Sequence, residues 1–436
     1  MDPRRRAWAE AAWAKIDDKR LTALIAGMVD IPSPTGEEGP LARWLAERLR
    51  EAGLAGRYQP IDDDQGNAAG RLRGDGTGPD LLLYAPIDTL SVGTEEEDVP
   101  QVGPVLRDDM RPSAVVDGDF VIGLGASNPK GHGAAIIAAA EAVAAAGIPL
   151  RGDVLIGLGA GGMPTNRRNV PQARRHNAGQ GNGCSFLLEQ GVHADYAVIA
   201  KPGWTAAWEE VGLCWFEVVV RGTYSYVGSR HRMPYRNPIV NAGTVIAGLE
   251  EWFPGYSARH TDGLVAPQGN IGGIEGGWRR TASLSPASCR FHVDLRISPR
   301  TTPMRAKREF GAAIDRIRAA HPDIDLDWEM TLAIPGSHTP ESDWIVRAAK
   351  AAWEELEGRP HEPILGNSGA TDANILRQWG IPTVRTGMDR IGEDAPMALD
   401  FPAGMNVVDV RQARKLTRAL IHTIVNTCTR TREEIA

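Results

Sequence analysis

The sequence predicts an α/β domain that is interrupted by a smaller, inserted α+β domain. Two observations carry this prediction: short apolar segments alternate with helical segments at both ends of the chain, and the middle shows a β-α-β-β-α-β order. A length of 436 residues suffices for two or three domains. We place the α/β domain at residues 1–213 and 332–436 and the insert at 214–331.

The first part of the chain begins with helices and continues with strands. Apolar residues recur at helical spacing over 21–28 and again over 41–49. An alanine-rich segment at 133–146 predicts a buried helix, and short apolar runs predict strands at 81–84, 120–122, 154–156 and 196–199. Strands that alternate with helices are typical of a largely parallel sheet covered on both faces.

The insert has a different pattern. We expect strands and helices in the order 216–220, 238–253 (helix), 270–274, 288–297, 303–320 (helix) and 324–330. The chain then returns to the first domain, with helices at 343–358 and 410–427 around a buried strand at 382–384.

Composition and charge exclude several classes of function. Because 48 basic residues face 55 acidic ones, for a net charge of −7, a nucleic-acid partner is not expected. The four cysteines are far apart and form no C-x-x-C pair, which argues against a zinc ribbon or a disulfide framework. No run approaches the roughly 20 apolar residues of a membrane span, and no secretory signal pattern is present. We expect a cytoplasmic protein with no membrane partner.

Six short segments carry a resemblance to a known family. They are IPSPTGEE at 31–38, LYAPIDT at 83–89, GLGASNPKG at 123–131, NA at 241–242, VDLR at 293–296 and GATD at 369–372. In this order they resemble the dinuclear zinc aminoacylase–carboxypeptidase family, which includes acetylornithine deacetylase, succinyl-diaminopimelate desuccinylase and the glutamate carboxypeptidases. The resemblance covers nearly the whole chain. It implies a zinc-exopeptidase-like mixed sheet flanked by helices, with an inserted lid that forms a homodimer.

The metal ligands of that family are replaced in this sequence. According to the resemblance, Pro86 stands at the first histidine ligand, Asn128 at the carboxylate that bridges the metals, and Lys201 at an acidic ligand. The paired glutamates, one a general base and one a ligand, fall at about Gly161 and Gly162. Zinc needs roughly four N, O or S donors per ion. We therefore expect neither a metal nor another cofactor.

Two further family histidines are also replaced. The resemblance aligns the catalytic histidine of the insert with Tyr226 and the last metal-binding histidine with the neighbourhood of Leu399. A tyrosine hydroxyl still donates a hydrogen bond to an oxyanion. Tyr226 therefore keeps part of the lost histidine's role.

The polar residues that remain define a candidate catalytic set of Lys201, Asp88, Asn128 and Tyr226. A fixed ammonium at Lys201 can polarise a carbonyl or hold a carboxylate, and burial can lower its pKa for work as a base or nucleophile. Asp88 can replace the lost general base. The structural alternative is that Lys201 forms a salt bridge with Asp88 or Asp372 and merely fills the former metal site.

A second set is assigned to substrate binding: Arg296, His231, Asn241, Lys130 and Asp372. Arg296 offers a bidentate fork to a carboxylate, with a surface ion pair as the alternative. Lys130 and Asp372 have structural alternatives, namely a buried lysine usual in the family and a loop anchor. His132 at a helix start is a polar contact or a neutral base. The basic loop at 165–183 either closes over an anionic ligand or is a solvated loop.

Three interpretations follow. The first is a metal-independent, amidohydrolase-like enzyme that acts on an amide or related C–N bond of a small carboxylated substrate. The second is a non-catalytic protein that binds a small ligand or regulates, and the third is a structural partner subunit of an active relative. Serine-hydrolase and nucleotide-binding functions are not supported, because the chain has no Gly-x-Ser-x-Gly motif and no helix pattern follows its glycine-rich segment at 157–162.

Overall fold

The computed structural model of this chain describes residues 1–165, 179–392 and 394–435, and most of the basic loop therefore lies outside the described residues. The chain divides into two compact units. Unit 1 comprises Met1–Trp208, Thr339–Pro363 and Thr371–Ala436, and unit 2 comprises Glu209–His338 and Ile364–Ala370. The division after Trp208 lies five residues before the boundary that we placed after residue 213.

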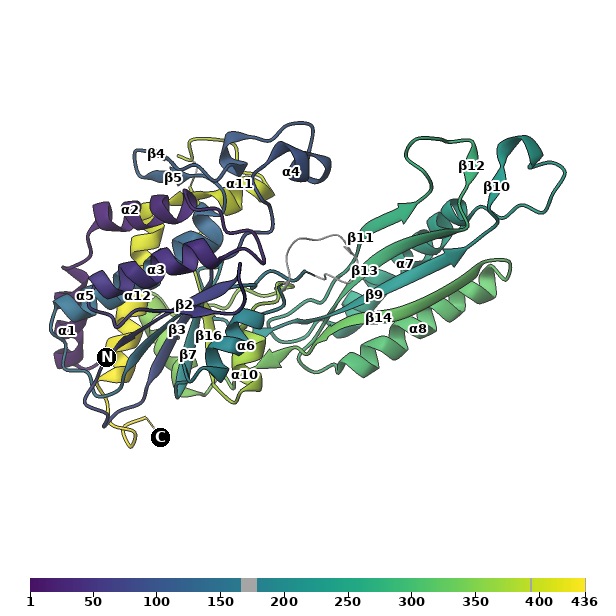
Figure 1. The fold of residues 1–436 in the computed structure, drawn as a ribbon. Helices are drawn as coiled ribbons and strands as arrows, with labels where there is room; N and C mark the ends of the chain where they lie inside the picture. Colours follow the sequence, from purple (N-terminus) through teal and green to yellow (C-terminus); the bar gives the residue numbers. More distant parts are fainter. Residues whose placement is uncertain (166–178, 393, 436) are drawn as a thin grey trace. The chain divides into compact units, whose positions relative to one another are not determined.

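A six-stranded mixed sheet forms the centre of unit 1 (Figure 1). Its strand order is β1 (Arg57–Pro60), β2 (Gly66–Leu72), β6 (Val154–Gly159), β3 (Leu81–Pro86), β7 (Tyr196–Ala200) and β16 (Thr383–Thr386). The last four strands run parallel, whereas β1 and β2 pair antiparallel. Every residue of β3 and β6 is buried, as expected for strands that helices cover on both faces. The predicted α/β fold class is confirmed.

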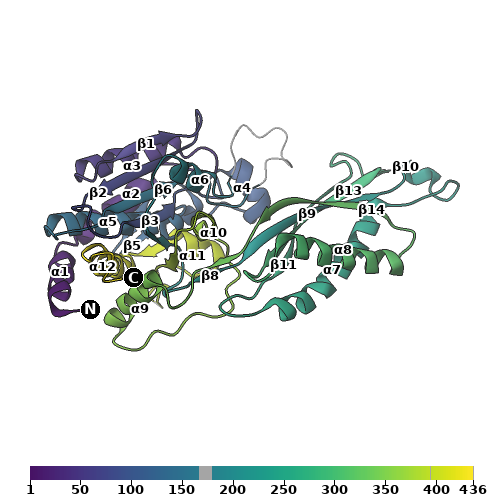
Figure 2. The same cartoon turned by 90° about the horizontal axis from the view of Figure 1, so that it is seen from below.

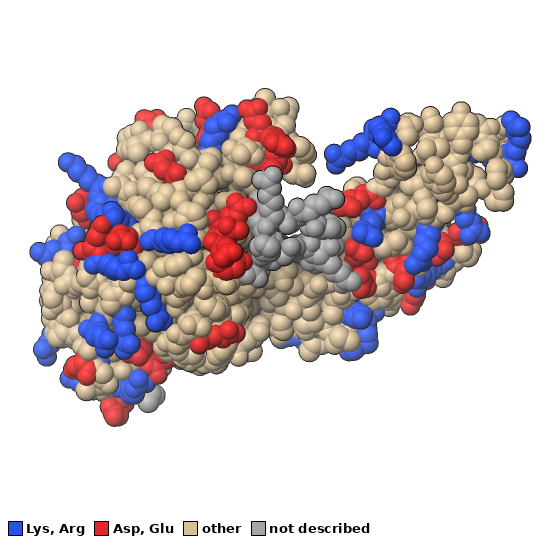
Figure 3. All heavy atoms as spheres, viewed as in Figure 1, with Lys and Arg blue, Asp and Glu red and all other residues tan. Residues whose placement is uncertain are grey.

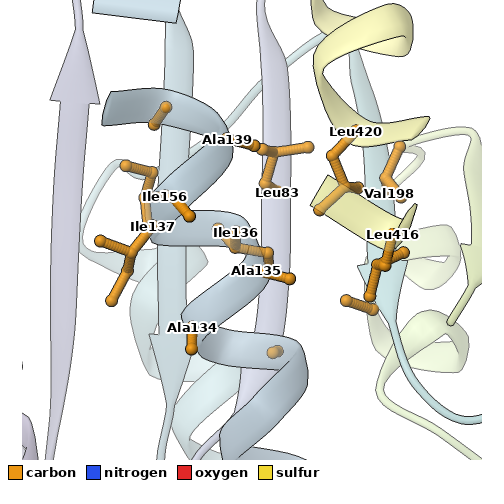
Figure 4. Packing of buried hydrophobic residues seen from close by; sticks show 14 of the residues in the cluster. Leu83, Ala134, Ala135, Ile136, Ile137, Ala139, Ile156, Val198, Leu416 and Leu420 are labelled. Carbon is orange, nitrogen blue, oxygen red and sulfur yellow. The ribbon is translucent and has the colours of Figure 1, made fainter. Parts of the chain in front are cut away.

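Helices pack against both faces of this sheet (Figure 1; Figure 2). On one face, Leu83, Ile156 and Val198 share a core with α5 (His132–Ala145) and α12 (Val410–Cys428), as Figure 4 shows. On the other face, Leu82 and Tyr84 share a core with α6 (Asn182–Glu189) and α10 (Ala373–Gln378). Neighbouring residues of β3 thus point to opposite faces, as strand geometry requires.

The remaining elements of unit 1 lie around this centre. Three helices form the N-terminal part, where we expected two: α1 (Pro3–Trp13), α2 (Asp18–Val29) and α3 (Gly39–Glu51). The other helices are α4 (Glu95–Val102), α9 (Trp344–Glu357) and α11 (Phe401–Asn406). The apolar run at 120–122 is a strand, β5 (Phe120–Ile122), but its expected place in the central sheet is wrong. It lies between β4 (Val115–Asp117) and β17 (Val407–Asp409) in a separate small sheet.

Unit 2 has the expected β-α-β-β-α-β order. Its antiparallel sheet has the order β11 (Gly269–Gly276), β13 (Ser288–Ile297), β9 (Gly212–Arg221) and β14 (Asp325–Ile334). Buried and more exposed residues alternate along β13, and the buried side packs with α7 (Pro238–His260) and α8 (Pro303–Ala320). Two short ladders complete the unit: β10 (Ser225–Tyr226) with β12 (Leu284–Ser285), and β8 (Glu209–Glu210) with β15 (Ser337–His338).

Helix α7 is longer than the pattern suggested. We expected it to end at Phe253, yet it continues through Pro254 to His260. The buried side chains of Tyr256 and His260 explain this continuation: Tyr256 donates a hydrogen bond to the Arg296 carbonyl at 2.9 Å. Among the described residues, no helix combines the length and the apolar character that a membrane crossing requires.

Candidate functional site

The candidate residues of unit 1 gather where parallel strands end. Asp88 follows β3, Gly161 and Gly162 follow β6, and Lys201 follows β7. Because these strands are parallel neighbours, their carboxyl ends lie at one edge of the sheet. This edge is where open α/β sheets bind ligands.

Lys201 and Asn128 are in contact. The Lys201 ammonium donates a hydrogen bond to Asn128 Oδ1 at 3.3 Å, and its side chain is largely buried. The backbone fixes the lysine as well, because its N–H donates to the Thr386 carbonyl at the end of β16. Two of the four predicted catalytic residues are thus side by side. They also occupy the positions that the family resemblance assigns to metal-binding carboxylates.

Asp88 is fully buried and accepts three hydrogen bonds. Its Oδ1 accepts from the Gly162 N–H at 2.9 Å, and its Oδ2 accepts from the Met163 N–H and the Thr35 hydroxyl, both at 2.8 Å. These bonds hold the segment after β6 against the segment after β3. They favour a structural role for Asp88, different from the salt bridge with Lys201 that we gave as the alternative, over a role as a general base.

A second buried carboxylate, Glu38, was missed by the sequence analysis. Its Oε1 accepts from the Gly36 and Gly161 N–H groups at 3.0 and 2.8 Å, and its Oε2 accepts from Gln65 Nε2 at 3.0 Å. Burial, together with the nearby negative charge of Asp88, raises the pKa of Glu38 to about 7. Glu38 stands in the motif at 31–38, but a sequence alone does not show which of two adjacent glutamates is buried.

Asp372 lies at the N-terminus of α10 and is also buried. Its Oδ2 accepts a hydrogen bond of 2.6 Å from the Tyr84 hydroxyl. Burial raises the pKa of Asp372 to about 7, although the Tyr84 hydrogen bond and the positive charge of Lys201 act in the opposite direction. Asp372 therefore exchanges a proton near neutral pH, within the electrostatic reach of Lys201.

Lys130 and His132 make mainly backbone contacts. The fully buried Lys130 donates to the Ile31 carbonyl at 3.1 Å, and burial lowers the pKa of Lys130 to about 7. His132 Nδ1 lies 2.8 Å from the Ser127 carbonyl, and its Nε2 accepts from the Met388 N–H at 3.3 Å. Burial lowers the pKa of His132 to about 3, which keeps the imidazole neutral. These contacts favour the structural alternative for both residues.

The other predicted residues belong to unit 2. Tyr226 is 57 % exposed on β10, and the exposed His231 accepts a hydrogen bond from Arg232 Nε at 3.0 Å. Asn241 lies in the first turns of α7. Arg296 forms a 2.7 Å ion pair with Asp294, its neighbour two residues earlier on β13. The ion pair that we gave as the alternative for Arg296 is present.

The residues at this edge of the sheet do not fit a dinuclear metal centre. Pro86 has no donor atom, and a Cβ atom placed on Gly162 would overlap the Pro86 ring. The Lys201 ammonium repels a cation from the place next to Asn128. In the part of the chain that the structure describes, no group of three or more His, Cys, Asp or Glu side chains is placed to hold a metal ion.

Comparisons with known proteins agree with the fold and the motifs. No protein-family model matches the chain. A succinyl-diaminopimelate desuccinylase from Methylobacterium sp. (strain 4-46) is 26% identical over 386 residues, which are 84% of this chain and 87% of that protein. An N-formyl-4-amino-5-aminomethyl-2-methylpyrimidine deformylase from Bacillus subtilis (strain 168) is 23% identical over 439 residues, 94% of each protein.

Solved structures share the fold over nearly the whole chain. Human carnosine dipeptidase 1 superposes with a TM-score of 0.69 at 16% identity, covering 96% of this chain and 99% of the other. An M20 family metallo-carboxypeptidase from Sulfolobus solfataricus gives a TM-score of 0.67 at 14% identity, covering 94% and 99%. The fold is thus that of the M20 metallopeptidases. The resemblance to the aminoacylase–carboxypeptidase family, first seen in six short motifs, is confirmed.

Proposed function

We propose that this chain hydrolyses an amide or related C–N bond of a small carboxylated substrate without a dinuclear metal centre. The two relatives described above are named for the removal of a succinyl and a formyl group. The observation that carries the proposal is the contact between Lys201 and Asn128, because it puts a fixed positive charge where the family resemblance expects metal ligands.

The proposed reaction uses two charged groups of unit 1. The Lys201 ammonium donates a hydrogen bond to the carbonyl oxygen of the substrate and stabilises the negative charge that develops there. Asp372, whose pKa is about 7, takes a proton from the attacking water and returns it to the nitrogen that leaves. The products are a carboxylic acid and an amine, and no proton is left over on the enzyme.

A second candidate is a non-catalytic protein that binds the same class of ligand. The observation that favours it is the use of Asp88 and Glu38 as acceptors for backbone N–H groups. A carboxylate that is occupied in this way is a poor base for water. The two candidates then differ only in whether Asp372 supplies the missing base.

The experiment is an assay of purified protein with a panel of N-acyl amino acids and dipeptides, in the presence and absence of a chelator. We expect amine release at the same rate in both conditions, and elemental analysis to find well under one zinc, manganese or cobalt per chain. Stoichiometric metal, or activity that chelator abolishes and metal restores, contradicts the proposal. Saturable binding by calorimetry without turnover supports the second candidate.

We also propose that unit 2 joins two copies of the chain, as the family resemblance implies. Strand β11 forms one edge of the described four-stranded sheet, and its Ile274 is 53 % exposed. Val240 on α7 is 64 % exposed. Light scattering at micromolar concentration should give the mass of a dimer, and a monomer would contradict this proposal.

A further inference from the structure

A pocket lies in unit 2 beside β10 and β12. Figure 1 shows these two strands at one end of the unit. Its volume is about 340 Å³, which is within the range of small-molecule sites. Residues of two segments line it: 225–239, which leads into α7, and 276–286, which connects β11 to β13. All lining residues belong to unit 2, so the pocket is complete within one unit.

The pocket is positively charged. Arg230 and Arg279 line it, and the segments 222–243 and 276–287 contain no Asp or Glu. Figure 3 shows Lys and Arg atoms at this end of the unit on the face in view. The Arg230 guanidinium lies 4.4 Å from the centre of the Tyr235 ring, and in the described part of the chain no ion pair joins Arg230 or Arg279 to a carboxylate. Two guanidinium groups without carboxylates nearby favour an anion.

The pocket also contains unused hydroxyl groups. Ser225 and Ser285 both line it, and they are paired residues of the β10–β12 ladder, so their side chains lie on the same side of it. Both Oγ atoms are sheltered from water, and neither has a hydrogen-bond partner among the described residues. Ser285 as a whole is only 9 % exposed. Sheltered polar atoms without a partner are uncommon in folded proteins, and an acceptor atom of a water molecule or a ligand that reaches them satisfies them.

We propose that this pocket binds a small molecule in which a carboxylate or phosphate group is attached to an apolar ring. The anion contacts Arg230 and Arg279, and its oxygens accept hydrogen bonds from Ser225 and Ser285. The ring packs against Trp278 and Leu284, which line the same pocket. Tyr226, His231, Asn241 and Arg296, the residues of unit 2 that we assigned to the reaction, do not line it. The pocket lies beside Tyr226, because Ser225 and Val227 flank that residue and Leu284 pairs with it, but none of the lining residues takes part in the proposed hydrolysis.

The test is isothermal titration of the full chain with benzoate, phenyl phosphate and the neutral analogue benzamide. We expect saturable one-to-one binding of at least one anion and much weaker binding of benzamide. Arg230→Gln and Arg279→Gln should each weaken the anion about tenfold or more, since each removes a charge-assisted hydrogen bond. The matched control is Arg316→Gln, an exposed arginine of α8 that does not line this pocket.

Binding of benzoate alone identifies a carboxylate ligand, and binding of phenyl phosphate alone identifies a phosphate ester. Ser285→Ala, which is small enough to leave the fold intact, should weaken the anion and leave benzamide unchanged. Absence of saturable binding to the wild-type chain overturns the proposal. Anion binding that survives the double Arg230→Gln, Arg279→Gln variant overturns it too, and an unchanged unfolding midpoint shows that these variants are folded.

Discussion

The hydroxyl of Tyr84 donates a 2.6 Å hydrogen bond to the carboxylate of Asp372, and this bond joins the interior of β3 to the N-terminus of α10. Both side chains are almost completely buried. Burial raises the pKa of Tyr84 well above its usual value, so the phenol remains protonated and always acts as the donor. Asp372 is therefore held in place by a partner that does not itself titrate near neutral pH.

Tyr84→Phe is expected to raise the pKa of Asp372 above about 7, because it removes a hydrogen bond that stabilises the carboxylate. The loss of one buried hydrogen bond to a charged group should also lower the free energy of unfolding by about 1–3 kcal/mol. Urea unfolding measures the second effect, and the acid limb of the pH–rate profile measures the first. An acid limb that stays in place would show that Asp372 is not the base.

Lys201→Met is expected to lower turnover about 10²–10³-fold, or to abolish ligand binding in a non-catalytic protein, because it removes the proposed donor to the carbonyl oxygen. Lys201→Arg should not restore the activity, since the planar guanidinium differs in shape from an ammonium. The control is Lys15→Met, at an exposed lysine of unit 1. Near wild-type activity and binding in Lys201→Met would mean that the lysine only fills space.

Glu38 makes stability depend on pH in acid solution. Its pKa is about 7 in the folded chain and 4.5 ordinarily, so between these values the folded state binds more protons than the unfolded state. Its contribution to the free energy of unfolding is full below about pH 4.5 and is lost as the pH rises to about 7. Glu38→Gln should remove this loss, as measured by urea unfolding across that range. The control is Glu10→Gln, at an exposed glutamate, which should leave the dependence of the free energy of unfolding on pH unchanged. If Glu38→Gln also leaves it unchanged, the pKa of Glu38 is not raised.

Lys130 should make the free energy of unfolding rise with pH, and this happens at higher pH than the effect of Glu38. Its pKa is about 7 in the folded chain and 10.5 ordinarily, so in this window the unfolded state binds more protons. The free energy of unfolding should therefore rise with pH from about 7 to about 10.5, by up to roughly 1.4 kcal/mol per pH unit. Lys130→Met, which keeps the length of the side chain, should remove this rise. The control is Lys15→Met, which should show the same rise in the free energy of unfolding as the wild type. If Lys130→Met also shows this rise, Lys130 is not neutral at high pH in the folded chain.

The sequence predicted helices and strands best where the burial of one face imposes a regular spacing of apolar residues. Strand β13 (Ser288–Ile297) and helix α8 (Pro303–Ala320) have the expected bounds, because one alternates apolar residues and the other begins with a proline that only the first turn accepts. Strands β1 and β2 were missed, since Arg57–Pro60 and Gly66–Leu72 contain no apolar run. They are strands because they pair with each other and with β6, and such pairing is not visible in a local pattern.

The candidate site was predicted only in part. Asp88 and Lys201 follow the parallel neighbours β3 and β7, whose carboxyl ends finish at the same edge of the sheet, whereas Asn128 and Asp372 precede the helices α5 and α10. The hydrogen bonds that decide the roles of Asp88 and Glu38 come from backbone N–H groups of the segment at 161–163, and these have no signature in the sequence. The roles assigned to Tyr226, His231, Asn241 and Arg296, the cytoplasmic location and the absence of a nucleic-acid partner stay predictions.

The contact between Pro86 and Gly162 limits the size of the residue that position 162 accepts. Any side chain at position 162 would collide with the Pro86 ring, and Gly161 has a φ of 62°, which favours glycine. A glutamate at position 162 therefore requires the two segments to move apart. Pro86→His does not change this, because the closest atom is the Cβ atom of residue 86, which histidine also carries. The segments after β3 and β6 thus act as a size filter on position 162, and this filter is independent of the charge or polarity of the residue placed there.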